Sequence, residues 1–158
     1  MLSSMMQDIT NFHEKFGLPQ REIGKSPSNK LANFRIKFIL EELQELNTAM
    51  GTENLGEVLD ALVDIVYVAL GTAYCFNLPF DEAWKRVHEA NMKKVRATDP
   101  SASKRGSTLD VVKPIGWEKP DIEGLLSADD VALKHPPVAL PLFEQVDLVE
   151  ELKKLKEK

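Results

Sequence analysis

Hydrophobic side chains recur at helical spacing through the first hundred residues of the chain. Met5, Ile9, Phe12 and Phe16 follow one another at steps of four, three and four, which predicts an amphipathic helix ending near Gly17. No segment before residue 100 alternates convincingly between apolar and polar positions, so we expect an all-α bundle with short links. Three further helices are predicted over residues 28–50, 55–76 and 80–96.

The composition changes to proline, glycine, serine and lysine over residues 98–121, where we expect a loop or arm with at most a short hairpin at residues 110–113. Residues 1–121 are predicted to form one domain and residues 122–158 a C-terminal extension, packed on the same domain or on a neighbouring subunit. The extension is expected to end in a helix from Phe143 or Glu144, with apolar positions at Val146, Val149, Leu152 and Leu155.

Two of the predicted helices carry acids where a buried helix would carry leucine. Leu31, Phe34 and Phe38 mark an apolar stripe whose continuation falls on Glu42 and Glu45. The segment over residues 55–74 is apolar almost all the way round, as expected of a fully buried helix. Its charged residues share one face at spacings i, i+3 and i+7; they are Glu57, Asp60 and Asp64.

These acids predict a bound cation. Burying an unpaired carboxylate destabilises the fold by roughly several kcal/mol, because the ion loses its hydration. No lysine or arginine is expected inside either stripe, so a divalent cation is the remaining partner. The alternative is that the acids lie on solvated faces, which accounts for Glu41 alone more easily than for three acids on an otherwise apolar helix.

Carboxylate ligands favour Mg²⁺, with Mn²⁺ as a substitute. Zinc prefers histidine or cysteine, and a di-iron bundle requires Glu-x-x-His pairs, which none of the three histidines completes. His13 and His88 are interpreted as polar residues on helix surfaces. The number of carboxylates exceeds what one Mg²⁺ needs, which favours two or more ions and hydrolysis at phosphorus.

Further residues are candidates for binding a phosphorylated substrate. Asn91 and Lys94, at i and i+3 on an inward stripe, would supply an amide and a positive charge; the alternative is a helix-end asparagine and a solvated lysine. In the arm, Lys113 and Trp117 offer another cation and an aromatic face for a base, and residues 104–105 add two more basic side chains.

The net charge of −5 disfavours non-specific nucleic-acid binding. Cys75 is the only cysteine, so no intrachain disulfide is possible and a reducing compartment is expected. Residues 1–20 do not show the pattern of a secretory signal, and Asp60 and Asp64 interrupt the apolar stretch, so we expect no membrane span and a cytoplasmic protein.

The two acidic motifs, Glu41-Glu42-Leu43-Gln44-Glu45 and Glu57-Val58-Leu59-Asp60, resemble those of the MazG-like, all-α nucleoside triphosphate pyrophosphohydrolase superfamily. Residues 87–95 also resemble the part of that family that contacts phosphate through asparagine and lysine, and residues 113–117 have the character of its small phage and bacterial members, related to phosphoribosyl-ATP pyrophosphohydrolase. The resemblance runs over residues 8–121.

The resemblance implies that water attacks the α-phosphorus of an NTP or dNTP, with two or three Mg²⁺ present, to give a monophosphate and pyrophosphate. It carries Asn91 and Lys94 over as substrate-binding residues and assigns Glu41, with Glu42 and Glu45, to catalysis, Glu41 positioning the water or supporting the ligands. The implied metal ligands are Glu42, Glu45, Glu57 and Asp60, and a second register adds Asp64.

The resemblance also implies a homo-oligomer, for which we expect a tetramer rather than a dimer, and the host cytoplasm if a phage encodes the chain. A purine substrate, dGTP or GTP, is our expectation. Two alternatives stay open at this point: phosphoribosyl-ATP as the substrate, and a non-catalytic helical scaffold of the same fold.

Overall fold

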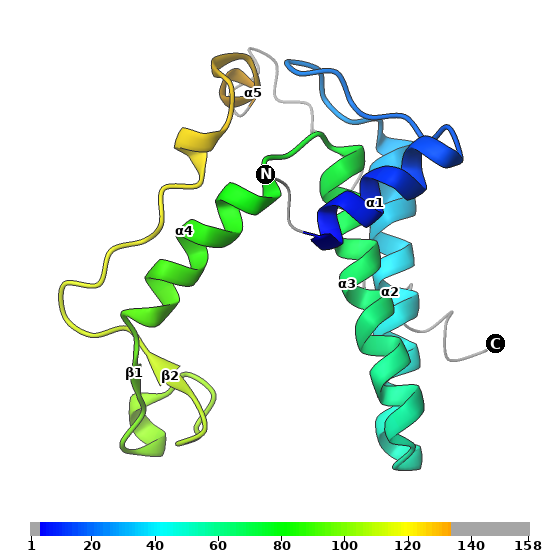
Figure 1. Cartoon of the computed structure of the whole chain (residues 1–158). Helices are drawn as coiled ribbons and strands as arrows, with labels where there is room; N and C mark the ends of the chain where they lie inside the picture. The colour runs from blue at the N-terminus through cyan, green and yellow to red at the C-terminus, as the bar shows by residue number, and fades with distance from the viewer. Residues whose placement is uncertain (1–3, 134–158) are drawn as a thin grey trace. The chain divides into compact units, whose positions relative to one another are not determined.

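The computed structural model describes residues 4–133 and is dominated by helices, which confirms the all-α class (Figure 1). The predicted C-terminal helix lies outside the described residues. The described residues divide into two compact units, unit 1 with residues 4–78 and 127–133, and unit 2 with residues 79–126. The elements are α1 (Ser4–Lys15), α2 (Asn29–Thr52), α3 (Leu55–Cys75), α4 (Phe80–Met92), β1 (Val95–Arg96), β2 (Val111–Val112) and α5 (Ala128–Ala132), with 3₁₀ helices at Pro100–Ala102 and Glu123–Leu125.

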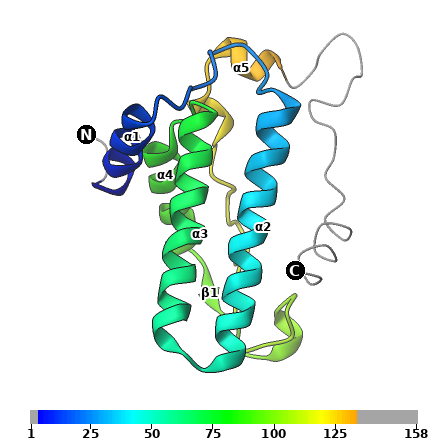
Figure 2. The same cartoon turned by 90° about the vertical axis from the view of Figure 1, so that its right-hand side faces the viewer.

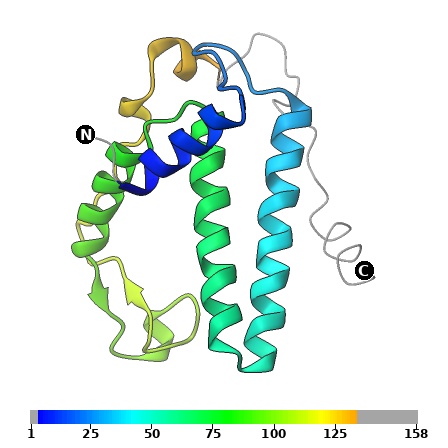
Figure 3. The same cartoon turned by 45° about the vertical axis from the view of Figure 1, so that its right-hand side comes forward.

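The long helices α2 and α3 form an antiparallel hairpin, and Figures 2 and 3 show them side by side along their length. Capping residues define its ends. The Ser28 hydroxyl accepts a hydrogen bond from the Leu31 amide at 3.2 Å, at the start of α2. Glu53 has a left-handed backbone (φ 56°), and the Asn54 side chain then accepts from the Gly56 amide at 3.0 Å. These local signals turn the chain back sharply, so that α3 packs on α2.

Small and polar residues lie in the seam between the two helices. The packing is tight at Gly71, because a Cβ there would lie 2.9 Å from Nη2 of Arg35 on α2 and 3.1 Å from Cε1 of His13 on α1. A larger residue would push these side chains apart. The buried residues are Ala32, Arg35, Leu40, Glu42 and Ala49 on α2, and Ala61, Val68, Leu70, Gly71, Ala73 and Cys75 on α3.

The expectation of a fully buried third helix is wrong for the single chain. Leu55, Leu59, Leu62 and Val66 are exposed on α3, and Phe34 on α2 is 57% exposed. The spacing of apolar residues predicted the helix correctly, but it is compatible with more than one apolar face, and not all of these faces are buried. In length and composition α3 meets the criterion for a membrane-spanning helix, which core helices of soluble proteins also meet. One face of α3 packs on α2.

The buried face of α1 also differs from the predicted stripe. Met6, Ile9 and His13 are its buried residues. His13, expected on the surface, is only 2% exposed. Its Nδ1 lies 2.9 Å from the Ile9 carbonyl oxygen, and its ring lies 4.4 Å from that of Tyr74. Aromatic packing on α3 and one backbone hydrogen bond therefore account for its burial, while Met5 stays exposed.

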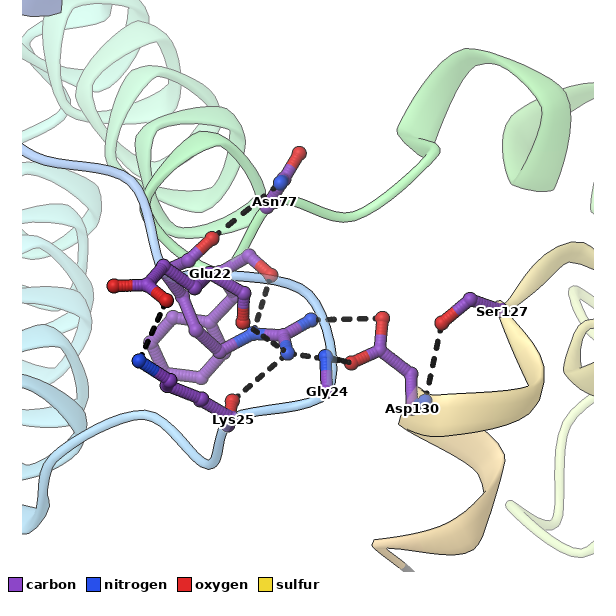
Figure 4. A network of polar contacts seen from close by, with 8 residues as sticks. Glu22, Gly24, Lys25, Asn77, Ser127 and Asp130 are labelled. Carbon is purple, nitrogen blue, oxygen red and sulfur yellow. Dashed lines mark hydrogen bonds and ion pairs between the residues drawn. The ribbon is translucent and has the colours of Figure 1, made fainter.

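Unit 1 is closed at one end by an ion pair between two segments far apart in the sequence. Figure 4 shows Asp130 of α5 facing the loop that carries Gly24 and Lys25. The Arg21 guanidinium in this loop donates to Asp130 at 2.5 Å and to the Phe76 carbonyl at 2.9 Å. The loop, the end of α3 and α5 thus share one arginine.

Unit 2 consists of α4, a two-stranded sheet and the arm. The prediction that the fourth helix reaches residue 96 is wrong, because α4 ends at Met92. The next residues form β1, which pairs with β2 antiparallel, so the sheet joins the end of the helix to the arm instead of forming a local hairpin at residues 110–113. The Ala97 amide extends the pairing by donating to the Asp110 carbonyl at 2.9 Å. The register pairs Val95 with Val112 and Arg96 with Val111.

Candidate active site

The acids of α2 and α3 gather around one buried carboxylate, Glu42, which is 7% exposed. Burial raises the pKa of Glu42 above its usual value, and the negative charges of Glu45, Asp64, Glu41 and Asp60 raise it further, in that order. Among residues 4–133, no basic side chain is among the causes that shift the pKa of Glu42. The charges of four of the six predicted acids therefore act on a fifth, the buried Glu42.

The six acids differ in how they are placed. Glu42 is buried and Asp64 is half-buried, and the others are exposed. Glu57 lies in the first turn of α3, where its backbone amide contacts the Asn54 side chain at 3.4 Å. Its charge is absent from those that raise the pKa of Glu42. The charge of Asp64, from the second register, thus acts on the buried carboxylate, and that of Glu57 is not among the charges that do.

The expected metal ligands do not form a ready-made coordination group. Among residues 4–133, no three His, Cys, Asp or Glu side chains lie together as a metal site requires. The chemistry of the donors nevertheless fits a hard divalent ion, because burial and four neighbouring acids disfavour the charge of Glu42, and a bound cation would stabilise it.

The seam contains a basic residue, Arg35, although the apolar stripes predicted none there. Arg35 is buried on α2, two turns before Glu42. Its guanidinium donates to the Val68 carbonyl at 2.6 Å and to the Thr72 hydroxyl at 3.0 Å. Desolvation lowers the pKa of Arg35. These hydrogen bonds hold the arginine on α3, so it ties the two helices together instead of neutralising the acids. Its position one heptad before Glu42 was the signal in the sequence.

The predicted substrate-binding residues all belong to unit 2. The Trp117 indole N–H donates to the Ala90 carbonyl at 2.7 Å, which fixes the ring at the end of α4. The ammonium of Lys113 lies 4.4 Å from the centre of the ring, and that of Lys94 lies 5.9 Å from it. Asn91 is exposed, and its carbonyl accepts from the Lys94 amide at 3.0 Å. Three of the four side chains thus meet at one indole ring.

This arrangement changes the interpretation of Trp117. The sequence suggested a free aromatic face for a base, but the ring is already in contact with an ammonium group. Cations attracted to an indole are held at a defined place, whereas a solvated lysine side chain is not. The ring therefore orients positive charge in unit 2.

Comparisons with known proteins agree with the acidic motifs. A family model described as phosphoribosyl-ATP pyrophosphohydrolase matches residues 9–91, which include all six acids and Asn91. An uncharacterized protein of Acanthamoeba polyphaga mimivirus is 32% identical over 79 residues. That alignment covers 48% of this chain and 32% of the viral protein, so the chain matches about a third of its relative's length.

Proposed function

Because the chain belongs to the phosphoribosyl-ATP pyrophosphohydrolase family, we propose that it hydrolyses a nucleoside triphosphate, NTP or dNTP, to the monophosphate and pyrophosphate. The family is one of pyrophosphohydrolases, so hydrolysis of a phosphoanhydride is its general chemistry. The observation that carries the proposal for this chain is Glu42, a buried carboxylate whose pKa is raised by the charges of acids on two helices.

In this proposal the acids hold Mg²⁺, or Mn²⁺ in its place, and the number of ions is two or three. Glu42, Glu45, Asp60 and Asp64 are the principal ligands, because the charges of the last three act on the buried carboxylate of Glu42. When bound, divalent ions supply charge neutralisation at the phosphates and activation of water. Glu41 is exposed next to the buried carboxylate and is available to orient the water and take its proton.

Unit 2 binds the anionic part of the substrate in this proposal. Lys94 and Lys113 supply positive charge to the phosphates, and Asn91 is placed at the exposed end of α4 to donate a hydrogen bond. Trp117 keeps the lysines in place. Lysine acts on phosphate as a point charge, so this set would serve triphosphates with different bases.

The test is release of pyrophosphate from a panel of NTPs and dNTPs, with Mg²⁺, with Mn²⁺ and with EDTA. We expect metal-dependent turnover that falls by about a hundredfold to a thousandfold in Glu42→Gln, on the scale measured for loss of a catalytic electrostatic group. Glu14→Gln, an exposed acid on α1, is the matched control and should retain wild-type activity. Asp64→Asn should cost more activity than Glu57→Gln.

The same assay, with phosphoribosyl-ATP added to the panel, decides between the candidate substrates. Phosphoribosyl-ATP is the second candidate, because the matched family carries its name. We propose a purine nucleotide, dGTP or GTP, as the preferred substrate, and the best turnover in the panel identifies the base. Turnover of phosphoribosyl-ATP alone would refute an NTP or dNTP as the substrate. A folded wild-type protein that turns over none of these compounds would favour a non-catalytic scaffold, in which Glu42→Gln also folds as wild type does.

We also propose that the chain is a homo-oligomer, a tetramer rather than a dimer, joined through the outer face of α3. Leu55, Leu59, Leu62 and Val66 are exposed at steps of four, three and four, a spacing that two copies of α3 can bury against each other. An apolar groove of about 460 Å³ between α1 and α3 adjoins this stripe. Light scattering should give a multiple of the 17.8 kDa chain. A monomer at all concentrations, or an unchanged mass for the Leu59→Lys oligomer, would refute the contact between copies of the chain through the outer face of α3.

A further inference from the structure

Unit 2 contains a pocket of about 380 Å³ that the acidic motifs do not explain. This volume lies within the range of small-ligand sites in proteins, roughly 300–1,000 Å³. Four cationic side chains and one carboxylate line it, which gives the pocket an excess of three positive charges at neutral pH. The lining residues are Lys94, Ala102, Lys104, Arg105, Asp110, Val111, Val112 and Lys113.

The single carboxylate of the pocket, Asp110, is already satisfied. It accepts from the Ser103 hydroxyl at 2.7 Å, from the Arg105 guanidinium at 2.9 Å and from the Val111 amide at 2.9 Å. The Ser103 hydrogen bond is the main cause that holds the pKa of Asp110 below its usual value, with Arg105 adding to it. Asp110 therefore stays ionised and holds Arg105 at the pocket.

The three lysines of the pocket have no such partner. Within residues 4–133, none of Lys94, Lys104 and Lys113 forms an ion pair with a carboxylate. Two of them are instead positioned by the Trp117 ring, which is itself fixed to the Ala90 carbonyl. Like charges held close together repel one another, so a concave site with ordered, uncompensated ammonium groups favours an anion of high charge.

We propose that this pocket is an oligophosphate-binding site, and that Lys104 and Arg105 are ligands of the phosphates in addition to Lys94 and Lys113. Adjacent phosphates present the dense negative charge that an excess of three positive charges matches. The guanidinium of Arg105 donates to Asp110 through Nη1, and 78% of its side chain remains exposed, so its other N–H groups are available to a ligand. That the phosphates are those of a nucleotide substrate rests on the proposed function; binding of the phosphates themselves does not.

The experiment is isothermal titration calorimetry of the full chain with inorganic pyrophosphate and tripolyphosphate, in EDTA so that metal ions at the acids cannot contribute. We expect Lys104→Ala to weaken binding about tenfold, which corresponds to the loss of one charge-assisted hydrogen bond of about 1.4 kcal/mol. Lys119→Ala is the matched control, because it removes the same charge from an exposed residue of unit 2 that does not line the pocket.

Each outcome is informative. Equal binding by wild type and Lys104→Ala, or no binding by wild type, would overturn the pocket whatever the enzyme hydrolyses. An equal loss in Lys119→Ala, or binding of a single-stranded oligonucleotide as tight as that of tripolyphosphate, would also overturn it, because both indicate a general electrostatic surface. Selective phosphate binding without turnover of any nucleotide would support the pocket and refute the proposed function.

Discussion

Replacing Asp130 by asparagine tests whether the closure of unit 1 depends on one buried ion pair. The side chains of Arg21 and Asp130 are only 6% and 9% exposed. Besides the 2.5 Å contact, a second guanidinium nitrogen lies 3.1 Å from the other carboxylate oxygen, and the Gly24 amide donates to the carboxylate at 2.9 Å. Asparagine keeps the shape of the side chain but removes the charge that these donors require.

The magnitude follows from the pKa of Asp130, which is lowered from 3.8 to about 2, first by the hydrogen bond from Arg21 and then by that from Gly24. At about 1.4 kcal/mol per pKa unit, the ionised carboxylate contributes about 2 kcal/mol at neutral pH. Asparagine also leaves the buried guanidinium without a counter-charge, and breaking buried pairs costs roughly 3–5 kcal/mol. We therefore expect the free energy of unfolding to fall by about 2–4 kcal/mol.

The effect of pH has a definite sign. The folded-state pKa of Asp130 lies below its unfolded value, so the stabilisation is fully present above about pH 4. As the pH falls from 4 to 2, the unfolded chain takes up a proton that the folded chain resists, and the stabilisation is lost. The difference between wild type and Asp130→Asn should therefore shrink across this interval.

The assay is urea denaturation followed by far-ultraviolet circular dichroism, at pH 7 and at steps down to pH 2. Asp129→Asn is the control, because Asp129 is an exposed acid in the same first turn of α5 and shares the helix-dipole effect. Equal losses in Asp129→Asn and Asp130→Asn, or a difference that does not change with pH, would refute the assignment to the Arg21 ion pair.

Two further predictions concern the seam of α2 and α3. Without metal, Glu42→Gln should have a higher melting temperature than wild type at neutral pH, because the raised pKa of Glu42 means that its ionisation opposes folding. This gain in stability should disappear as the pH falls and Glu42 takes up a proton. Mg²⁺ should raise the melting temperature of wild type only. Gly71→Ala should lower the free energy of unfolding by about 1–3 kcal/mol through overlap with Arg35, whereas Gly51→Ala, which meets nothing within 4 Å, should be neutral or stabilising in the same denaturation assay. An unchanged Gly71→Ala protein would mean that the seam adjusts without strain.

The local sequence determined the helices and most of their ends. Apolar steps of three and four residues predicted α1 to α4, and the structure confirms each of them to within a few residues. The turn between α2 and α3 depends on its own residues, because Asn54 caps the helix that follows it. Spacing also placed the acids on facing helices, since residues three, four or seven apart share a face whatever the helix packs against. These features depend on neighbours in the sequence, which is why the sequence reveals them.

Only the tertiary structure decided which face each helix buries and which distant segments meet. Apolar stripes overlapped on α1 and α2, and contact with α3 selected the ones that contain His13 and Arg35. The pairing of residues 95–96 with 111–112 ended α4 early, because strand pairing depends on partners 15 and 17 residues away and not on helical period. The same pairing lies beside the basic pocket, where Lys94 and Lys113 meet. Periodicity within a segment does not encode its partner, so these contacts required the folded chain.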